Sequence, residues 1–240
     1  MADSQDVLLS TVVMDTLAAA AVVGGFWLAV SWMRSFGKKI GYSLAPLGFS
    51  RPRGGFFAGV RAGVAVGVGA ILLGIVVKPL SVLVLERLGY STRSTIQQPF
   101  MEGLVGWVHK SPGAAIPAIV LVVVFFVPAM EELVFRGAVF NGLYRLGVLI
   151  STRAIGMEHP TGLLSKTVFV PSALASSVLF ALLHLEAVIF PILLILAILL
   201  CALFKRSGSL LPSFVAHATF NSFAASLIIL RGLNVLNFPI

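Results

Sequence analysis

Two adjacent carboxylates and an arginine lie in one of the most apolar parts of the chain, Val127-Pro-Ala-Met-Glu-Glu-Leu-Val-Phe-Arg-Gly137. The preceding residues, Ile119 to Phe126, carry no polar side chain. A charge at the centre of a bilayer costs roughly 2.5–3.5 kcal/mol on insertion scales, so such groups usually pair or line a wet cavity. Glu132 and Arg136 are four residues apart with the carboxylate first, the favourable order for an ion pair on a helix. Glu131 points about 100° away from this pair and is left free for chemistry.

Two histidines in the apolar second half of the chain could share a site with these carboxylates. His184 ends the segment Phe180-Ala-Leu-Leu-His184, and His217 lies four residues before Asn221, on the same face of a helix. A single histidine in an apolar helix is more often an interhelical hydrogen-bond partner than a catalytic group. Three separate segments that bring polar groups into hydrocarbon favour one shared cavity, because water there would solvate all of them.

Several known catalytic motifs are absent from the sequence, which argues against the mechanisms that depend on them. The sequence contains no Gly-x-Ser-x-Gly or Gly-x-Ser-Gly nucleophile motif, no aspartate after Asp15 and no His-Glu-x-x-His zinc motif. What remains is glutamate with histidine. Glu131 could act as a general base on water, a histidine across the cavity could orient that water, and a His/Asn pair could donate to a developing oxyanion.

Composition places the chain in a membrane. Of its 240 residues 58% are hydrophobic and 11% are charged, and the mean hydropathy is +1.04. Soluble domains are about 45–50% apolar and about 25% charged. The net charge of +8 is spread over short stretches between apolar runs, as in membrane proteins, and predicts no nucleic-acid partner. The single cysteine, Cys201, excludes an intrachain disulfide and a cysteine-based metal site.

The apolar runs are long enough for helices and lack the alternation of a membrane barrel, so the predicted fold is an all-α, polytopic transmembrane bundle. It forms a single integral membrane domain over residues 1–240. About six to eight membrane helices are expected, and splitting the third run into two spans would raise the count from six. The expected runs are about 7–33, 55–77, 113–146, 167–185, 187–204 and 210–230.

Several local features predict how these helices are built and oriented. The loop Arg34 to Arg53 carries five basic residues and no acid, which indicates the cytoplasmic side and puts the N-terminus outside. Glycines at 55, 59, 63 and 67 form a strip for close packing within the chain, with a dimer face as the alternative. Residues 81–88 suit a short interfacial helix, and Pro128 should break or kink its helix. Asp15 is expected to lie near a helix end or face the bundle without chemistry.

Taken together, the polar residues resemble a known family. The trio Glu-Glu-x-x-x-Arg (Glu131, Glu132, Arg136), Phe-x-x-x-His (Phe180, His184) and His-x-x-x-Asn (His217, Asn221) resembles the CAAX prenyl protease type II family, the CPBP group of CAAX proteases and bacteriocin-processing enzymes. The resemblance covers about residues 128–226, which would form the catalytic core. Leu47-Gly-Phe49 and Arg206-Ser-Gly-Ser-Leu-Leu-Pro212 also look like accessory motifs of that family.

The resemblance implies an intramembrane endopeptidase with assigned roles. Glu131 and His184 would activate water for attack on a peptide carbonyl, and His217 with Asn221 would form the oxyanion site. Glu132, Arg136 and Phe180 would hold the architecture. No cofactor is expected, although zinc is possible, in which case its ligands would be Glu131, His184 and His217.

The implied setting is the plasma membrane of a prokaryote, because the chain is short and lacks a eukaryotic extension. The expected partners are the lipid bilayer and a peptide or membrane-protein substrate, which need not be prenylated; the oligomeric state is open. Two alternatives use the same residues differently: a non-catalytic immunity or scaffold protein of this fold, and a small proton-coupled transporter. The lack of matching inverted halves counts against the transporter.

Overall fold

The computed structural model describes residues 4–35, 47–94, 97–155 and 163–236, and within these ranges the chain is helical and contains no β-strand. The fold prediction is therefore confirmed. Among the described residues, six helices are long and apolar enough to cross a membrane. In chain order, the elements are α1 (Ser4–Ser35), α2 (Phe56–Arg87), α3 (Gln97–Lys110), α4 (Pro112–Ile119), η2 (Val120–Phe126), α5 (Val127–Glu132), η3 (Leu133–Phe140), α6 (Asn141–Ile155), α7 (Leu163–Leu183), α8 (Phe190–Ser207) and α9 (Leu210–Gly232).

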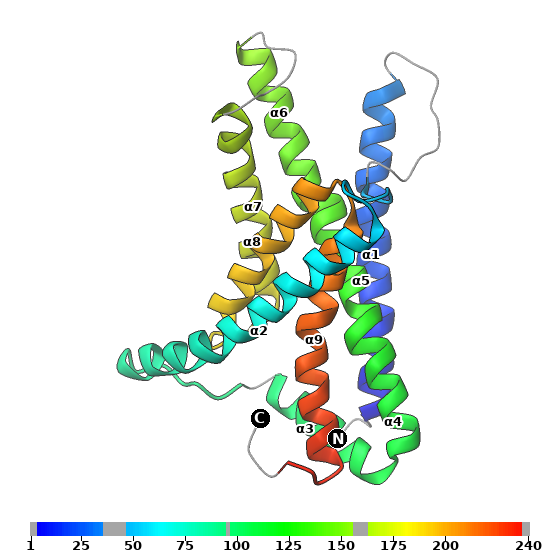
Figure 1. Cartoon of the computed structure of the whole chain (residues 1–240), viewed down its shortest axis with the longest axis vertical. Coiled ribbons are helices and arrows are strands. Elements are labelled where there is room, and N and C mark those ends of the chain that lie inside the picture. Colours follow the sequence, from blue (N-terminus) through cyan, green and yellow to red (C-terminus); the bar gives the residue numbers. More distant parts are fainter. Residues whose placement is uncertain (1–3, 36–46, 95–96, 156–162, 237–240) are drawn as a thin grey trace.

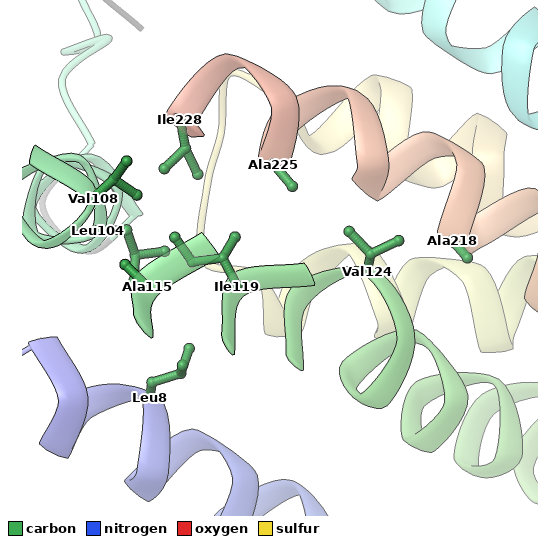
Figure 2. Packing of buried hydrophobic residues seen from close by; sticks show 9 residues of the cluster. All are labelled: Leu8, Leu104, Val108, Ala115, Ile119, Val124, Ala218, Ala225 and Ile228. Carbon is green, nitrogen blue, oxygen red and sulfur yellow. The ribbon is translucent and has the colours of Figure 1, made fainter. Parts of the chain in front are cut away.

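The last helix, α9, is the centre of the bundle (Figure 1). It packs against α2, α8, α3 and the segment η2–α5, while α7 packs on α8 and α1 packs on η3 and α5. At one end of the bundle, apolar side chains from α1, α3, α4, η2 and α9 form a core (Figure 2). This arrangement places the helix that carries Glu131 and Glu132 directly beside α9. The buried members of the core are Leu8, Leu104, Val108, Ala115, Ile119, Val124, Ala218, Ala225 and Ile228.

The predicted glycine strip packs within the chain, against α9. A Cβ at Gly63 would lie 2.6 Å from the carbonyl oxygen of Pro212, and one at Gly67 would lie 2.6 Å from that of Ala216. A Cβ at Gly59 would lie 2.9 Å from Cγ of Pro52 and 3.2 Å from Cγ of Pro212. The prediction was wrong for Gly55, which precedes the helix with φ 93° and has open space around it. Small residues therefore set the short distance between α2 and α9.

Two predicted helix boundaries were wrong. The residues expected as a separate interfacial helix, 81–88, continue α2, which passes through Pro79 and ends at Arg87. The third run also extends further than expected, because α6 continues to Ile155 through what was predicted to be a loop. In a membrane, continued helix satisfies backbone hydrogen bonds that an irregular segment would leave unpaired, which favours helix at both places. Of the predicted basic loop, residues 36–46 lie outside the described residues.

Pro128 neither breaks the helix nor divides the third run into two spans. Helical geometry continues through Phe126 (φ −68°, ψ −55°) and Val127 (φ −58°, ψ −51°). The predicted break is replaced by a wide π turn, η2, immediately before Val127, whose amide donates to the carbonyl of Val122 five residues back. A second π segment, η3, follows Glu132. Such wide turns are rare and often found at functional sites, and here they flank the two carboxylates.

Candidate active site

The ion pair predicted between Glu132 and Arg136 is present. Arg136 Nη1 lies 3.0 Å from Glu132 Oε1, and both side chains are 1% exposed. The guanidinium also stacks on the ring of Phe180, 4.7 Å from its centroid. A buried cation with a single counter-charge and an aromatic face beneath it is fixed in position. Glu132 is thereby held on the buried side of the helix.

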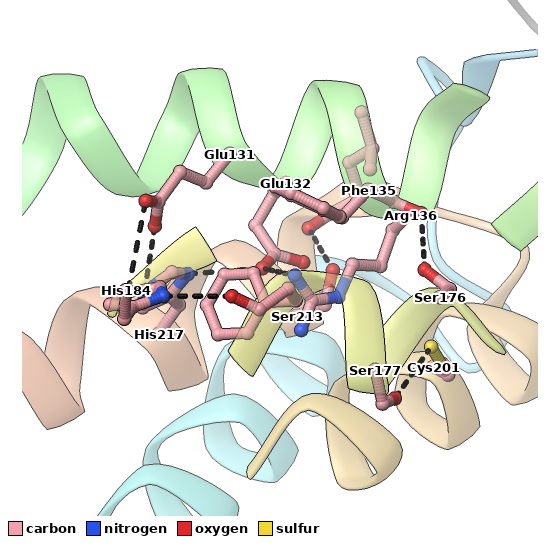
Figure 3. A network of polar contacts seen from close by, with 12 residues as sticks. Glu131, Glu132, Phe135, Arg136, Ser176, Ser177, His184, Cys201, Ser213 and His217 are labelled. Carbon is pink, nitrogen blue, oxygen red and sulfur yellow. Dashed lines mark hydrogen bonds and ion pairs between the residues drawn. The ribbon is translucent and has the colours of Figure 1, made fainter. Parts of the chain in front are cut away.

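Glu131 meets both predicted histidines on the other side of this turn (Figure 3). Its Oε2 lies 3.4 Å from His217 Nε2, and its Oε1 lies 4.0 Å from His184 Nε2. The Glu131 and His184 side chains are 22% and 21% exposed, whereas that of His217 is 3% exposed. Three helical segments, α5, the end of α7 and α9, therefore bring a carboxylate and two imidazoles together.

The other ring nitrogen of each histidine has a partner that fixes its orientation. His184 Nδ1 donates to the carbonyl of Phe180 at 2.8 Å, so its neutral ring presents the lone pair of Nε2 toward Glu131. His217 Nδ1 lies 3.0 Å from Glu132 Oε1. This second contact was missed in the sequence, where Glu132 was paired with Arg136 alone. Glu132 thus connects the buried cation to the histidine that faces Glu131.

Phe180 is the packing centre of the site. It is fully buried, and its ring stacks edge-on against Phe135 at 5.1 Å and contacts the rings of His184 and His217 at 4.7 Å and 5.7 Å. One side chain therefore touches both imidazoles and the Arg136 guanidinium. This geometry fits the support role that the resemblance implied.

The cluster opens into a cavity of about 430 Å³. Glu131 and His184 line it together with Met130 and Phe135, and α1 contributes Asp15 to its wall. Asp15 was expected to have no chemistry, and the structure places it in the same cavity as the free carboxylate. The lining of the cavity is therefore mainly apolar and contains two carboxylates, Asp15 and Glu131.

One comparison with known proteins found a match for the part of the chain that contains these residues. Residues 113–223 match the family model of the Rce1-like type II CAAX prenyl endopeptidases. The resemblance predicted from the sequence is confirmed over this part of the chain, 111 of its 240 residues. No match was found among curated proteins or among solved structures. The matched core contains α4 to α8 and the part of α9 that bears His217, while α1, α2 and α3 lie outside it.

The two accessory motifs of the CAAX-protease resemblance meet in space. The amide of Leu210 donates to the carbonyl of Gly48 at 3.0 Å, and the amide of Arg53 donates to that of Ser207 at 2.9 Å. A Cβ on Gly48 would lie 2.5 Å from the ring of Phe204, so this close approach requires glycine. The joined segments line a second cavity of about 600 Å³, which reaches Glu132 on the far side of Met130.

A set of hydrogen bonds between Ser94, Gln97 and Glu186, called the tether below, connects the loop after His184 to the start of α3 and was not predicted from the sequence. The hydroxyl of Ser94 donates to Glu186 Oε1, and the amide of Gln97, at the start of α3, lies 2.9 Å from the same hydroxyl and 3.3 Å from the carboxylate. Between His184 and Glu186, Leu185 has a positive φ of 54°, a conformation that is unfavourable for a leucine. The only signal in the sequence was a carboxylate two residues after the histidine.

Zinc is the one cofactor that the sequence left possible at this site. Among the described residues, no group of three or more His, Cys, Asp or Glu side chains is arranged so that it could hold a metal ion. Glu131, His184 and His217, the possible zinc ligands, do lie near one another, and each histidine uses Nδ1 for a protein partner while Nε2 faces Glu131. Metal independence therefore stays a prediction.

Proposed function

We propose that this protein is an intramembrane endopeptidase in which Glu131 activates water. The observation that carries the proposal is the position of one carboxylate opposite the Nε2 atoms of two histidines, at 4.0 Å and 3.4 Å, in a cavity within the bundle. The match of residues 113–223, which include Glu131, His184 and His217, to a CAAX prenyl endopeptidase family supports it. Peptide hydrolysis is the chemistry that such a set of groups serves.

The 4.0 Å separation between Glu131 Oε1 and His184 Nε2 is too long for a direct hydrogen bond but suits one bridging water. Both atoms accept hydrogen bonds, because His184 keeps its hydrogen on Nδ1 for the carbonyl of Phe180. A water between them donates both hydrogens and turns an oxygen lone pair outward. Glu131 takes one proton as that oxygen attacks the peptide carbonyl carbon. The C–N bond then breaks, and the proton passes from Glu131 to the leaving amine.

His217 is the proposed donor to the oxyanion formed in this attack. Its Nδ1 faces the Glu132 carboxylate at 3.0 Å, so the ring can carry a hydrogen on each nitrogen with its charge balanced locally. Nε2–H then points toward the reacting carbonyl near Glu131. Asn221, one turn further along α9, is the second proposed donor, through its side-chain amide. Donors fixed before the reaction stabilise the transition state without reorganisation.

The substrate is proposed to be a peptide or a segment of a membrane protein. The larger cavity is lined mainly by apolar groups, among them Phe49, Leu211 and Phe214, and it adjoins the catalytic turn at Met130. An apolar segment entering from the bilayer would be stabilised there. The ends of α6 and α8 and the start of α2 lie on one side of the bundle (Figure 1), where most basic residues gather. We propose that this side is cytoplasmic, in a prokaryotic plasma membrane.

The test compares membranes that express the unaltered protein, Glu131→Gln and the matched control Glu102→Gln. Glu102 is an exposed carboxylate of α3, 3.4 Å from Gln98 and away from the site. Proteomics of these membranes should show proteins with shortened C-termini in the first and third samples only, since loss of a general base costs about 10²–10⁴-fold in rate. Both variants should unfold at the same temperature as the parent.

Unchanged cleavage in Glu131→Gln would refute the proposed base. If no sample shows shifted termini, yet Glu131→Gln abolishes a cellular phenotype of the protein, the scaffold alternative gains support. Flux into proteoliposomes that depends on Glu131 would instead favour a transporter.

A further inference from the structure

The side-chain amide of Asn221 bonds to the backbone of a neighbouring helix. Its Nδ2 donates to the main-chain carbonyl of Val123 at 3.1 Å, across the interface between α9 and η2. Because a carbonyl oxygen has two lone pairs, such a bond either adds to the carbonyl's own helical bond or replaces a missing one. The donors available to Val123 therefore decide what this contact does.

Val123 lies five residues before Pro128. In the wide turn η2 the amide of Val127 donates to the carbonyl of Val122, which is the five-residue spacing of a π turn. With the same five-residue spacing, the amide at position 128 would donate to the carbonyl of Val123. Proline has no amide hydrogen, so the carbonyl of Val123 loses its donor within the helix. The amide of Asn221 occupies that place.

This contact also sets the axial position of α9 relative to the helix that bears the carboxylates. His217, one turn before Asn221, lies 3.4 Å from Glu131 and 3.0 Å from Glu132. Val124, the neighbour of Val123, packs with Ala218 in the core, so the two helices are in direct contact here. The Asn221 bond and the His217 contacts are thus successive ties between the same two helices. The Asn221 bond ends on a backbone carbonyl, whose position does not depend on a side-chain rotamer.

We propose that Asn221 is a positioning residue that replaces the amide missing at Pro128, and that the pair sets the register of His217 against Glu131. The register part of the proposal rests on the proposed function, whereas the hydrogen-bond part does not. The Nδ2 amide carries two hydrogens, so this role is compatible with the proposed oxyanion role. It makes a specific claim: the contribution of Asn221 depends on proline at position 128.

A double-variant cycle tests the claim. Asn221→Ala should lower the unfolding temperature of the detergent-solubilised protein by about 2–8 °C, because a buried carbonyl is left unsatisfied. In a Pro128→Ala background, whose new amide can reach the carbonyl of Val123, the same change should cost less than about half of that shift. Asn221→Leu, which fills the space without a donor, should repeat the pattern and separate the hydrogen bond from loss of packing. The control Ser222→Ala removes a hydroxyl that bonds within α9 at 2.7 Å, and its effect should be the same in both backgrounds.

The catalytic arm uses a membrane protein whose C-terminus shifts in the proteome comparison. Because the proposed oxyanion donor is lost in both backgrounds, the test is the difference between them: Asn221→Ala should lower kcat at least about 10-fold more with Pro128 present than in the Pro128→Ala background. Equal losses of unfolding temperature and of kcat in both backgrounds would overturn the proposal and leave Asn221 as a substrate donor only. Because the thermal arm needs no turnover, it still decides the hydrogen-bond role if the protein proves not to be a protease. Pro128→Ala substitutes a strong helix former in a helix, so this background should fold.

Discussion

The buried pair of Glu132 and Arg136 predicts an unequal response to losing either partner. Glu132→Gln keeps an acceptor for His217 but leaves the guanidinium without a counter-charge, at 1% exposure. None of the Arg136 nitrogens has another protein hydrogen-bond partner in the described part of the chain. Leaving such a charge unpaired costs about 3–5 kcal/mol. Arg136→Met should cost less, because the Glu132 carboxylate keeps its bond to His217, and a bond to a charged group is worth about 1.5–3 kcal/mol.

The measurement is SDS-induced unfolding of the purified protein in detergent micelles, with Arg61→Met as the control. Arg61 is an exposed cation of α2, and its loss should change the free energy of unfolding by no more than about 0.5 kcal/mol. The double variant Glu132→Gln/Arg136→Met should recover much of the loss seen in Glu132→Gln, since it leaves no net charge buried. The reasoning is refuted if Glu132→Gln costs less than Arg136→Met, or if the two losses simply add.

Three further predictions follow from other contacts. Gly67→Ala would bring a Cβ within 2.6 Å of the carbonyl of Ala216 and should destabilise the protein by about 1–3 kcal/mol; Gly69→Ala, with nothing within 4 Å, should be neutral or stabilising in the same unfolding assay. Glu186→Ala should remove the tether to Ser94, raise hydrogen exchange in residues 183–190 and lower kcat about 10-fold; unchanged exchange there would show that the tether does not order the loop. Chelator treatment and elemental analysis should show full activity with no bound metal, and loss of activity that added zinc restores would contradict the metal-free mechanism.

The parts of the site that could be predicted from the sequence depend on local spacing or on hydrophobic exclusion. The Glu132–Arg136 pair follows from a separation of four residues on one helix. The meeting of Glu131 with the histidines follows because three apolar segments would otherwise leave polar groups in lipid. Both arguments need only the periodicity of a helix and the cost of burial. The glycine strip on α2 was predictable for the same reason, since its period is visible in the sequence.

The rest depends on which distant segments become neighbours. Ser94 and Glu186 are separated by 92 positions, and neither lies in a pattern that pairs them. The bond between Asn221 and Val123 spans 98 positions, and its acceptor is a backbone atom that no side-chain motif reveals. The predicted break at Pro128 is absent, although the proline does remove a donor from its own helix. Whether the helix breaks depends on whether a neighbouring helix supplies a replacement.

The two wide turns around Glu131 and Glu132 can therefore be explained by separate neighbours. The first, η2, is compatible with Pro128 because α9 provides Asn221 at the carbonyl that the proline leaves free. The second, η3, contains Gly137, where a Cβ would lie 3.0 Å from the carbonyl of Leu47 in the segment that walls the larger cavity. Rare backbone geometry persists only where the surroundings determine it. Here the neighbour of η2 is the helix that carries His217, and the neighbour of η3 is the loop that lines the apolar cavity. The first wide turn therefore positions the carboxylates against the histidines, and the second positions them against the proposed substrate space.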